Sequence, residues 1–492
     1  MELKDIVLIK KRKGYLVFLC LILIVLMSWS FISSSQEQLS ASINIEGIWE
    51  GKLIVPGGEL KIVFNISSEN DILTATMDSP NQGVTGIPVE KVNFSNHKVV
   101  LEVKLILGVF EGELNKDSMQ IEGEWRQGGS SFPLFLKKVE KKVEIVRPQE
   151  PTPPFPYQVE EVFFENHQAK IKLAGTLTLP EGKGPFPAVV LISGSGPQDR
   201  DETVFGHRPF LVLADYLTRL GIAVLRFDDR GVGKSQGDFS TATSKDFSSD
   251  VLTGIEFLKQ REEINNHQIG LIGHSEGGII APMVAVQSAD VAFIVLMAGT
   301  GLTGEEIIYL QQTLISRAEG VSEEKIKRDR QYNEKIFSVI KSEQDNKIKE
   351  EKILQIMTDY WEDLSAEEKT KFGDLEVYSK SQVGSFLSPW LRFFLIYDPK
   401  PTLNQVKCPV LAINGELDLQ VPPKENLSAI EEALKKGQNK NYTIQELPNL
   451  NHLFQTAQTG SPSEYGKIEE TISPLALKTI GDWILKILGL SN

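Results

Sequence analysis

The residues most suited to chemistry occupy positions 273–277, which read Gly-His-Ser-Glu-Gly. They follow an apolar run at 269–272 and precede a helix-like stretch that begins at Gly277. A G-x-S-x-G sequence between a strand and a helix forms a sharp turn that lifts the serine hydroxyl above the sheet edge, and the flanking glycines allow close backbone approach. Ser275 is therefore a predicted nucleophile; the simpler interpretation is a serine that caps the helix.

A serine hydroxyl needs a general base to become nucleophilic. Nucleophiles on a strand–turn–helix unit are followed along the chain by an Asp or Glu and then by a His. Of the six histidines only His452 follows Ser275, and it lies in a loop after the strand-like run 442–447. His452 is the predicted base, and the alternative is an ordinary surface histidine.

The acid that orients the base should leave the end of the intervening strand. The apolar run 410–413 leads into Asn-Gly-Glu-Leu-Asp, which offers Glu416 and Asp418. We predict that Asp418 orients His452 and stabilises its imidazolium. Glu416 is the second candidate, and in a third interpretation both are turn carboxylates.

Acyl transfer also requires N–H donors for the developing oxyanion. One donor is predicted to be the backbone N–H of Glu276, directly after the nucleophile. The other should come from the loop at 193–197, Ser-Gly-Ser-Gly-Pro. Since Pro197 has no N–H, Ser195 or Gly196 is the expected donor; the alternative is a flexible turn.

Aromatic residues gather near the end of a helical, charge-mixed insertion at 303–397. Trp390, Phe393, Phe394 and Tyr397 recur at helical spacing and form one apolar face. One interpretation is packing of the insertion onto the rest of the domain. In the other, Trp390 and Phe394 bind substrate in an acyl or aromatic pocket above the nucleophile.

The elements around these residues predict a parallel sheet covered by helices. Apolar strands alternate with helical stretches, which is typical of a sheet buried on both faces. A hairpin (159–164, 171–179) precedes the strands, which are expected at 188–192, 223–227, 269–272, 293–297 and 410–413. Helices are expected at 210–220, 247–261 and 277–287. An insertion as long as 303–397 predicts a helical cap rather than a loop.

The region 42–140 is predicted to be a separate all-β domain. Its short strands with Gly, Asn, Asp and Pro between them predict an antiparallel barrel or sandwich. The expected strands are 52–55, 60–66, 72–77, 98–103, 109–114, 119–125 and 132–139. Trp49 and Trp125 are interpreted as core residues, with sugar stacking as the alternative. The proline-rich run 147–157 is predicted to be a semi-rigid linker to the domain 158–490.

The first residues, 1–35, combine a basic segment with an apolar run at 16–32. This pattern predicts a signal peptide cleaved before Gln36, or a retained membrane anchor formed by 16–32. In both cases the protein is expected to be exported: periplasmic, extracellular or anchored to the outer face of the membrane.

Composition excludes several classes of protein. A net charge of −14 argues against a nucleic-acid binder, which needs a basic face. Two cysteines cannot form a disulfide framework.

The run 228–235 ends in Gly-Lys-Ser, but Asp228 stands where a phosphate loop needs glycine, so we reject nucleotide binding. Nothing in the sequence fixes an oligomeric state.

Three segments together resemble the α/β-hydrolase superfamily, and within it bacterial serine esterases related to dienelactone-hydrolase-like and acyl-peptidase-like branches. The segments are 193–197, 227–235 and 273–278. The resemblance implies an α/β-hydrolase fold over 158–490 with an accessory β-domain ahead of it, and a structural ion pair of Asp228 with Arg230. The chain departs from relatives in having Ser193 where many carry His, and from dienelactone hydrolases in having Ser275 where they carry Cys.

The combined prediction is a carboxylesterase that forms an acyl-enzyme on Ser275, acts on a small ester, and needs neither metal nor organic cofactor. A serine peptidase or acyl-aminoacyl hydrolase with the same triad is the second candidate. A noncatalytic envelope protein, whose β-domain binds glycan or a partner, represents a different class. The intact order Ser275, Asp418, His452 argues against it.

Overall fold

The computed structural model describes residues 45–490 apart from short gaps, and the predicted leader 1–35 lies outside the described residues. The gaps are 56–57, 70–71, 80–83, 107, 116–118, 128–129, 141–146, 367 and 370–374. Among the helices of the described part, none is both long and apolar enough to span a bilayer.

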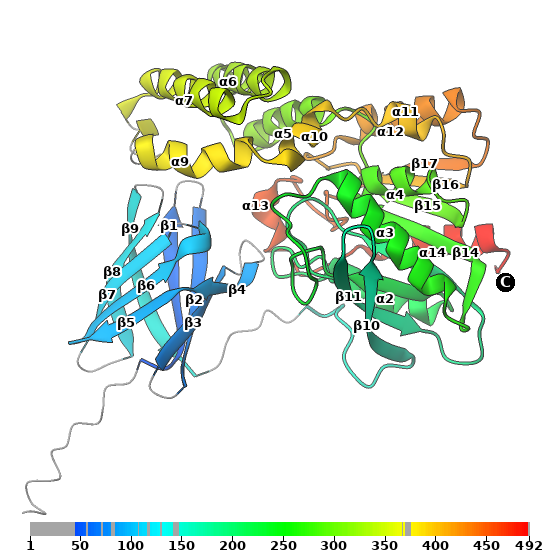
Figure 1. Ribbon diagram of the computed structural model, residues 1–492, viewed down its shortest axis with the longest axis horizontal. Coiled ribbons are helices and arrows are strands. Elements are labelled where there is room, and N and C mark those ends of the chain that lie inside the picture. Colours follow the sequence, from blue (N-terminus) through cyan, green and yellow to red (C-terminus); the bar gives the residue numbers. More distant parts are fainter. Residues whose placement is uncertain are drawn as a thin grey trace, which may run out of the picture. The chain divides into compact units, whose positions relative to one another are not determined.

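The N-terminal domain is an antiparallel sheet of nine strands in the order β4-β3-β2-β1-β9-β8-β7-β6-β5 (Figure 1). Its strands are β1 Gly47–Val55, β2 Gly58–Glu69, β3 Ile72–Ser79, β4 Val84–Val89, β5 Lys91–Ser95, β6 Lys98–Val103, β7 Gly108–Leu114, β8 Gln120–Gln127 and β9 Ser130–Val139. Contacts of β3 with β5 and of β4 with β6 bring the sheet edges together into a nearly closed barrel. The seven predicted strands are confirmed; β4 and β5, with only one residue between them, were not predicted.

The interior of this domain is aromatic. Trp49 and Trp125 are each only 1% exposed, and the Trp125 ring lies 6.2 Å from that of Phe64. Small barrels are filled by their own inward-facing side chains. The core interpretation of the two tryptophans is therefore confirmed, and sugar stacking on them is wrong.

The C-terminal domain is built on an eight-stranded sheet in the order β10-β11-β13-β12-β14-β15-β16-β17. The strands are β10 Gln158–Asn166, β11 Ile171–Leu179, β12 Phe186–Ile192, β13 Ala223–Phe227, β14 Ile264–His274, β15 Val291–Met297, β16 Val410–Gly415 and β17 Tyr442–Leu447. The β10–β11 hairpin is antiparallel and β12 to β17 run parallel. The predicted α/β-hydrolase fold, preceded by an all-β domain, is confirmed.

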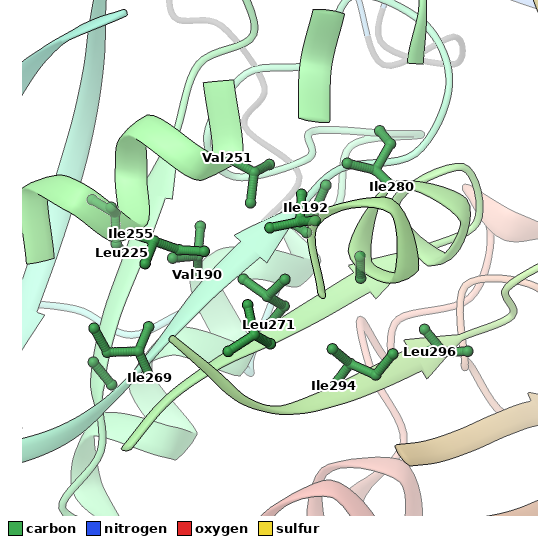
Figure 2. Packing of buried hydrophobic residues seen from close by; sticks show 14 of the residues in the cluster. Val190, Ile192, Leu225, Val251, Ile255, Ile269, Leu271, Ile280, Ile294 and Leu296 are labelled. Atoms are coloured by element: carbon green, nitrogen blue, oxygen red, sulfur yellow. The ribbon is translucent and has the colours of Figure 1, made fainter. Parts of the chain in front are cut away.

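Helices cover both faces of this sheet because its central strands are apolar on both sides. The main helices are α2 Pro209–Arg219, α3 Ser244–Lys259, α4 Gly277–Ala285, α12 Pro423–Lys436 and α14 Pro474–Leu488; α11 Lys400–Leu403 and α13 Pro462–Tyr465 are short. Val190 and Leu271 lie on the face covered by α3, α4 and α12, and Figure 2 shows them in one cluster with Val251 of α3 and Ile280 of α4. The alternate residues of the strands, such as Leu191, pack against α2 and α14.

The insertion between β15 and β16 is helical, as predicted. It comprises α5 Gly304–Ala318, α6 Glu323–Ser342, α7 Asn346–Glu362, α9 Leu375–Phe386 and α10 Pro389–Ile396. The cap has an apolar core of its own, which includes Ile336, Ile340, Ile353 and Met357. A long insertion with its own core is a subdomain and not a loop.

The start of the proline-rich segment is fixed to the C-terminal domain. Arg147 is 5% exposed and donates hydrogen bonds to four backbone carbonyls, those of Phe205, Gly206, Gly466 and Ile468. A buried guanidinium is stable only when its donors are used. The residues predicted to open a linker are therefore a docked part of the C-terminal domain.

Candidate active site

Ser275 occupies a strained turn between β14 and α4. Its φ is +52°, in the left-handed region that non-glycine residues rarely adopt. The turn is held by a 2.8 Å hydrogen bond from the Ser275 N–H to the carbonyl of Met297 at the end of β15. Such strain at the end of a central strand exposes the side chain and is typical of catalytic nucleophiles.

The glycines of the motif are required by close backbone contacts. A Cβ on Gly273 would lie 2.0 Å from the carbonyl oxygen of Gly277. A Cβ on Gly277 would lie 2.2 Å from the carbonyl oxygen of Ile192, at the end of β12. These contacts bring the start of α4 against two strands, so its positive end points toward the region of the nucleophile.

The predicted base and acid are joined directly. Nδ1 of His452 lies 2.8 Å from Oδ2 of Asp418, and both side chains are buried. The other oxygen of Asp418 accepts the backbone N–H groups of Gln420 and Val421, each at 2.8 Å. A carboxylate held in this way fixes the proton of His452 on Nδ1 and leaves Nε2 as the basic nitrogen.

Glu416, the second candidate for the acid, has a different contact. Its Oε2 accepts the backbone N–H of Asn449 at 2.9 Å, and the side chain is exposed. It therefore supports the loop that carries His452, while Asp418 contacts the imidazole.

The loop of His452 packs against the residue that precedes the nucleophile. Nε2 of His274 lies 3.0 Å from the backbone oxygen of His452, and the two rings are 4.9 Å apart, centre to centre. This contact brings a loop 178 residues further along the chain to the nucleophile turn. The structure thus brings Ser275, His452 and Asp418 into one region.

Two of the predicted N–H donors are free to bind an oxyanion. In the described part of the chain, the N–H groups of Ser195 and Glu276 donate to no protein acceptor. The N–H of Gly194 is already taken by Oε1 of Glu202, at 2.6 Å. Since Ile192 pairs with Gly273, the loop after β12 and the nucleophile turn leave the same edge of the sheet.

The side chain of Glu276 holds the cap. Its buried carboxylate accepts Nε1 of Trp390 at 2.9 and 3.0 Å and the hydroxyl of Ser244 at 2.5 Å. Burial raises the pKa of Glu276. Trp390 stacks on Phe394, which is buried in a cluster with Ile279. Both aromatic residues pack the cap onto the domain, and their role in substrate binding stays a prediction.

The expected ion pair of Asp228 with Arg230 is wrong. Asp228 pairs with Arg200, whose Nη2 lies 2.7 Å from Oδ2, while Arg230 pairs with Asp250 on α3. The two side chains leave the turn after β13 toward different partners. Each ion pair joins this turn to a separate element.

Ser193, where many relatives carry His, donates its hydroxyl to Oδ1 of Asp229 at 3.1 Å. The second oxygen of Asp229 accepts the N–H of Gln198 at 3.0 Å, and burial raises the pKa of this carboxyl well above its usual range. These bonds fix both ends of the oxyanion loop.

Two residues of the site were not predicted, Glu202 and His274. His274 is part of the pentapeptide, but the motif pattern leaves its position variable. Glu202 lies five residues after the 193–197 segment but belongs to no motif, and only its folded position beside His274 reveals it. Among the described residues, no group of three His, Cys, Asp or Glu side chains is arranged to hold a metal ion.

Comparison with known proteins gives three related findings. Residues 208–349 match the family model described as serine aminopeptidase, S33. The chain is 35% identical to the esterase EstD of Thermotoga maritima over 167 residues, which are 32% of this chain and 39% of EstD. It is 25% identical to an uncharacterized 31.7 kDa protein of Escherichia coli, over 56% of this chain and 88% of that protein.

The chain thus spans well under half of the length of EstD. A solved esterase structure from Pyrococcus furiosus covers 67% of this chain and 91% of its own, at 18% identity and a TM-score of 0.40. The strand order and the strained serine turn, with the family match over 208–349, fit the α/β-hydrolase fold of the C-terminal domain.

Proposed function

We propose that the protein is a serine hydrolase that cleaves carboxylic esters through an acyl-enzyme on Ser275. The observation that carries the proposal is the 2.8 Å hydrogen bond between Asp418 and His452, on a loop packed beside the nucleophile turn. A buried acid–histidine pair next to a strained serine is the arrangement that activates a hydroxyl. The similarity to EstD supports an ester as the substrate.

In the proposed reaction, Nε2 of His452 takes the proton of Ser275 as its Oγ attacks the ester carbonyl. The N–H groups of Ser195 and Glu276 stabilise the oxyanion, and the positive end of α4 adds to their effect. The imidazolium then protonates the leaving alcohol. Water, deprotonated by the same imidazole, releases the acid and restores Ser275.

The test is hydrolysis of p-nitrophenyl esters from acetate to laurate by residues 36–492. The control is Ser275→Ala, which keeps the fold but lacks the nucleophile. Labelling by a fluorophosphonate reports independently on an activated serine. Ester hydrolysis and labelling that both disappear in Ser275→Ala support the proposal, whereas a folded wild type that does not label contradicts it.

A serine peptidase with the same triad is the second candidate, because residues 208–349 match a family model described as a serine aminopeptidase. A wild type that labels but leaves every ester intact would favour it. Aminoacyl p-nitroanilides then provide the direct assay. Labelling of Ser275 also separates both enzymes from a noncatalytic envelope protein.

We further propose that the enzyme is exported, on the basis of the basic and apolar pattern in residues 1–35. Fractionation of cells that express the full chain, followed by N-terminal sequencing, tests this. A mature N-terminus at Gln36 indicates cleavage. An intact N-terminus in the membrane fraction indicates an anchor, and an intact chain in the cytosol contradicts export.

A further inference from the structure

A second acid–histidine pair lies directly behind the nucleophile. Nδ1 of His274 is 2.9 Å from Oε1 of Glu202, and the two residues are 6% and 3% exposed. The same oxygen of Glu202 accepts the N–H of Gly194 at 2.6 Å. One carboxylate oxygen therefore connects the oxyanion loop to the residue before Ser275.

The other nitrogen of His274 points to an acceptor as well. Nε2 lies 3.0 Å from the backbone oxygen of His452, and a carbonyl oxygen can only accept. Oε1 of Glu202, the oxygen that faces His274, also accepts the N–H of Gly194, as a carboxylate oxygen can accept two donors. With Glu202 as this carboxylate, both nitrogens of His274 donate, so its ring is an imidazolium.

The charges around the ring are consistent with this state. Burial disfavours the cation and by itself would lower the pKa of His274. The attraction of the Glu202 carboxylate is larger when combined with the hydrogen bonds to Glu202 and to the His452 carbonyl, so the pKa of His274 is raised above its usual value. Asp418, on the far side of His452, adds a smaller attraction. The ring of Phe454, 6.2 Å away, contributes an apolar wall.

We propose that Glu202 and His274 form a buried ion pair that positions both halves of the active site. Glu202 holds the oxyanion loop through Gly194, and the His274 cation holds the base through the backbone oxygen of His452. Both are positioning residues, because their side chains act through Gly194 and His452. This inference rests on the proposed function, since it assigns the pair to the same reaction.

Glu202→Gln removes the charge and keeps an oxygen that can accept from Gly194. Without the carboxylate a neutral His274 carries a single ring proton, so one of its two hydrogen bonds is lost. Small displacements of a catalytic group cost about 10²-fold in rate. We expect fluorophosphonate acylation and kcat to fall by about 10²-fold while KM changes little.

The matched control is Glu464→Gln. Oε1 of Glu464 also accepts a glycine N–H at 2.6 Å, that of Gly460, but within the described residues no hydrogen bond or ion pair joins Glu464 to a histidine. We expect its acylation rate to stay near the wild-type rate. Thermal melting of both variants separates a displaced site from an unfolded domain.

NMR of the full chain labelled with ¹⁵N-histidine tests the ion pair without relying on activity, and His274→Asn assigns the signals. In the wild type, both ring nitrogens of His274 should be protonated at pH 7, and in Glu202→Gln one should lose its proton. A neutral His274 in the wild type at pH 7, or a Glu202→Gln variant that acylates at the wild-type rate, overturns the proposal. A wild type that does not label overturns the proposed function instead, and the ring signals still decide the ion pair.

Discussion

The indole of Trp390 on α10 donates its N–H to the carboxylate of Glu276, the residue that follows the nucleophile. One hydrogen-bonded pair therefore connects the cap to the turn whose backbone is expected to stabilise the oxyanion. The same carboxylate accepts the hydroxyl of Ser244 at the start of α3. Docking of the cap and the geometry of the nucleophile turn are consequently linked.

Trp390→Phe should loosen the cap, because it keeps most of the stacking on Phe394 but leaves a buried carboxyl without its indole donor. A hydrogen bond to a charged group contributes about 1.5–3 kcal/mol, and we expect the free energy that holds the cap on the domain to fall by that amount. Limited proteolysis of the cap measures it. Trp483→Phe, which removes a donor to the hydroxyl of Thr443, is the control and should cost about 1 kcal/mol or less. Equal proteolysis of the two variants would show that Glu276 does not hold the cap.

Asp418→Asn should nearly abolish turnover while the protein stays folded. The amide can no longer hold the proton of His452 on Nδ1, so the imidazole takes the wrong tautomer, a change that costs about 10⁴-fold in kcat in serine hydrolases. Hydrolysis of p-nitrophenyl acetate measures the effect. Glu416→Gln retains an oxygen for the N–H of Asn449 and should lose no more than a few-fold. The reverse ranking would make Glu416 the acid.

Arg147→Met should destabilise the C-terminal domain, although the residue lies outside its sheet. Four backbone carbonyls lose their donor, and we expect the free energy of unfolding of this domain to fall by about 2–4 kcal/mol. The temperature at which fluorophosphonate labelling disappears reports on this domain alone. Arg317→Met breaks an exposed ion pair with Glu323 and should cost less than about 1 kcal/mol. An Arg147→Met variant as stable as this control would mean that the segment is an ordinary linker.

His207 should make the C-terminal domain sensitive to acid. It is buried between Thr471 and the backbone oxygen of Tyr465, and burial, with the charge of Arg147, lowers its pKa to about 4. Below about pH 6.5 the unfolded chain binds a proton here that the folded chain does not bind until about pH 4. The stabilisation is therefore complete above about pH 6.5 and decreases by about 3 kcal/mol as the pH falls to 4.

Urea unfolding of the wild type and of His207→Gln at several pH values measures this contribution. The variant starts from a lower stability, but it should lose about 3 kcal/mol less than the wild type between pH 7 and pH 4. Parallel pH dependences would show that His207 is not the acid-sensitive group.

The sequence alone determined the layout of the domains, the parallel sheet and the order Ser275, Asp418, His452. These features are local: apolar runs define strands, glycine spacing defines the nucleophile turn, and chain order selects the base. Strands β4 and β5 escaped prediction because a single residue separates them and β4 contains Gly86 and Pro88, residues that usually mark turns.

Only the tertiary structure decided which charges meet. The partners of Asp228 and Arg230 lie in other elements, 28 and 20 positions away, and no local pattern encodes them. Glu202 and His274 are 72 positions apart and meet because β12 and β14 are neighbours in the sheet. Side-chain direction and burial determine hydrogen bonds and proton positions, and both arise only when the strands have been brought side by side.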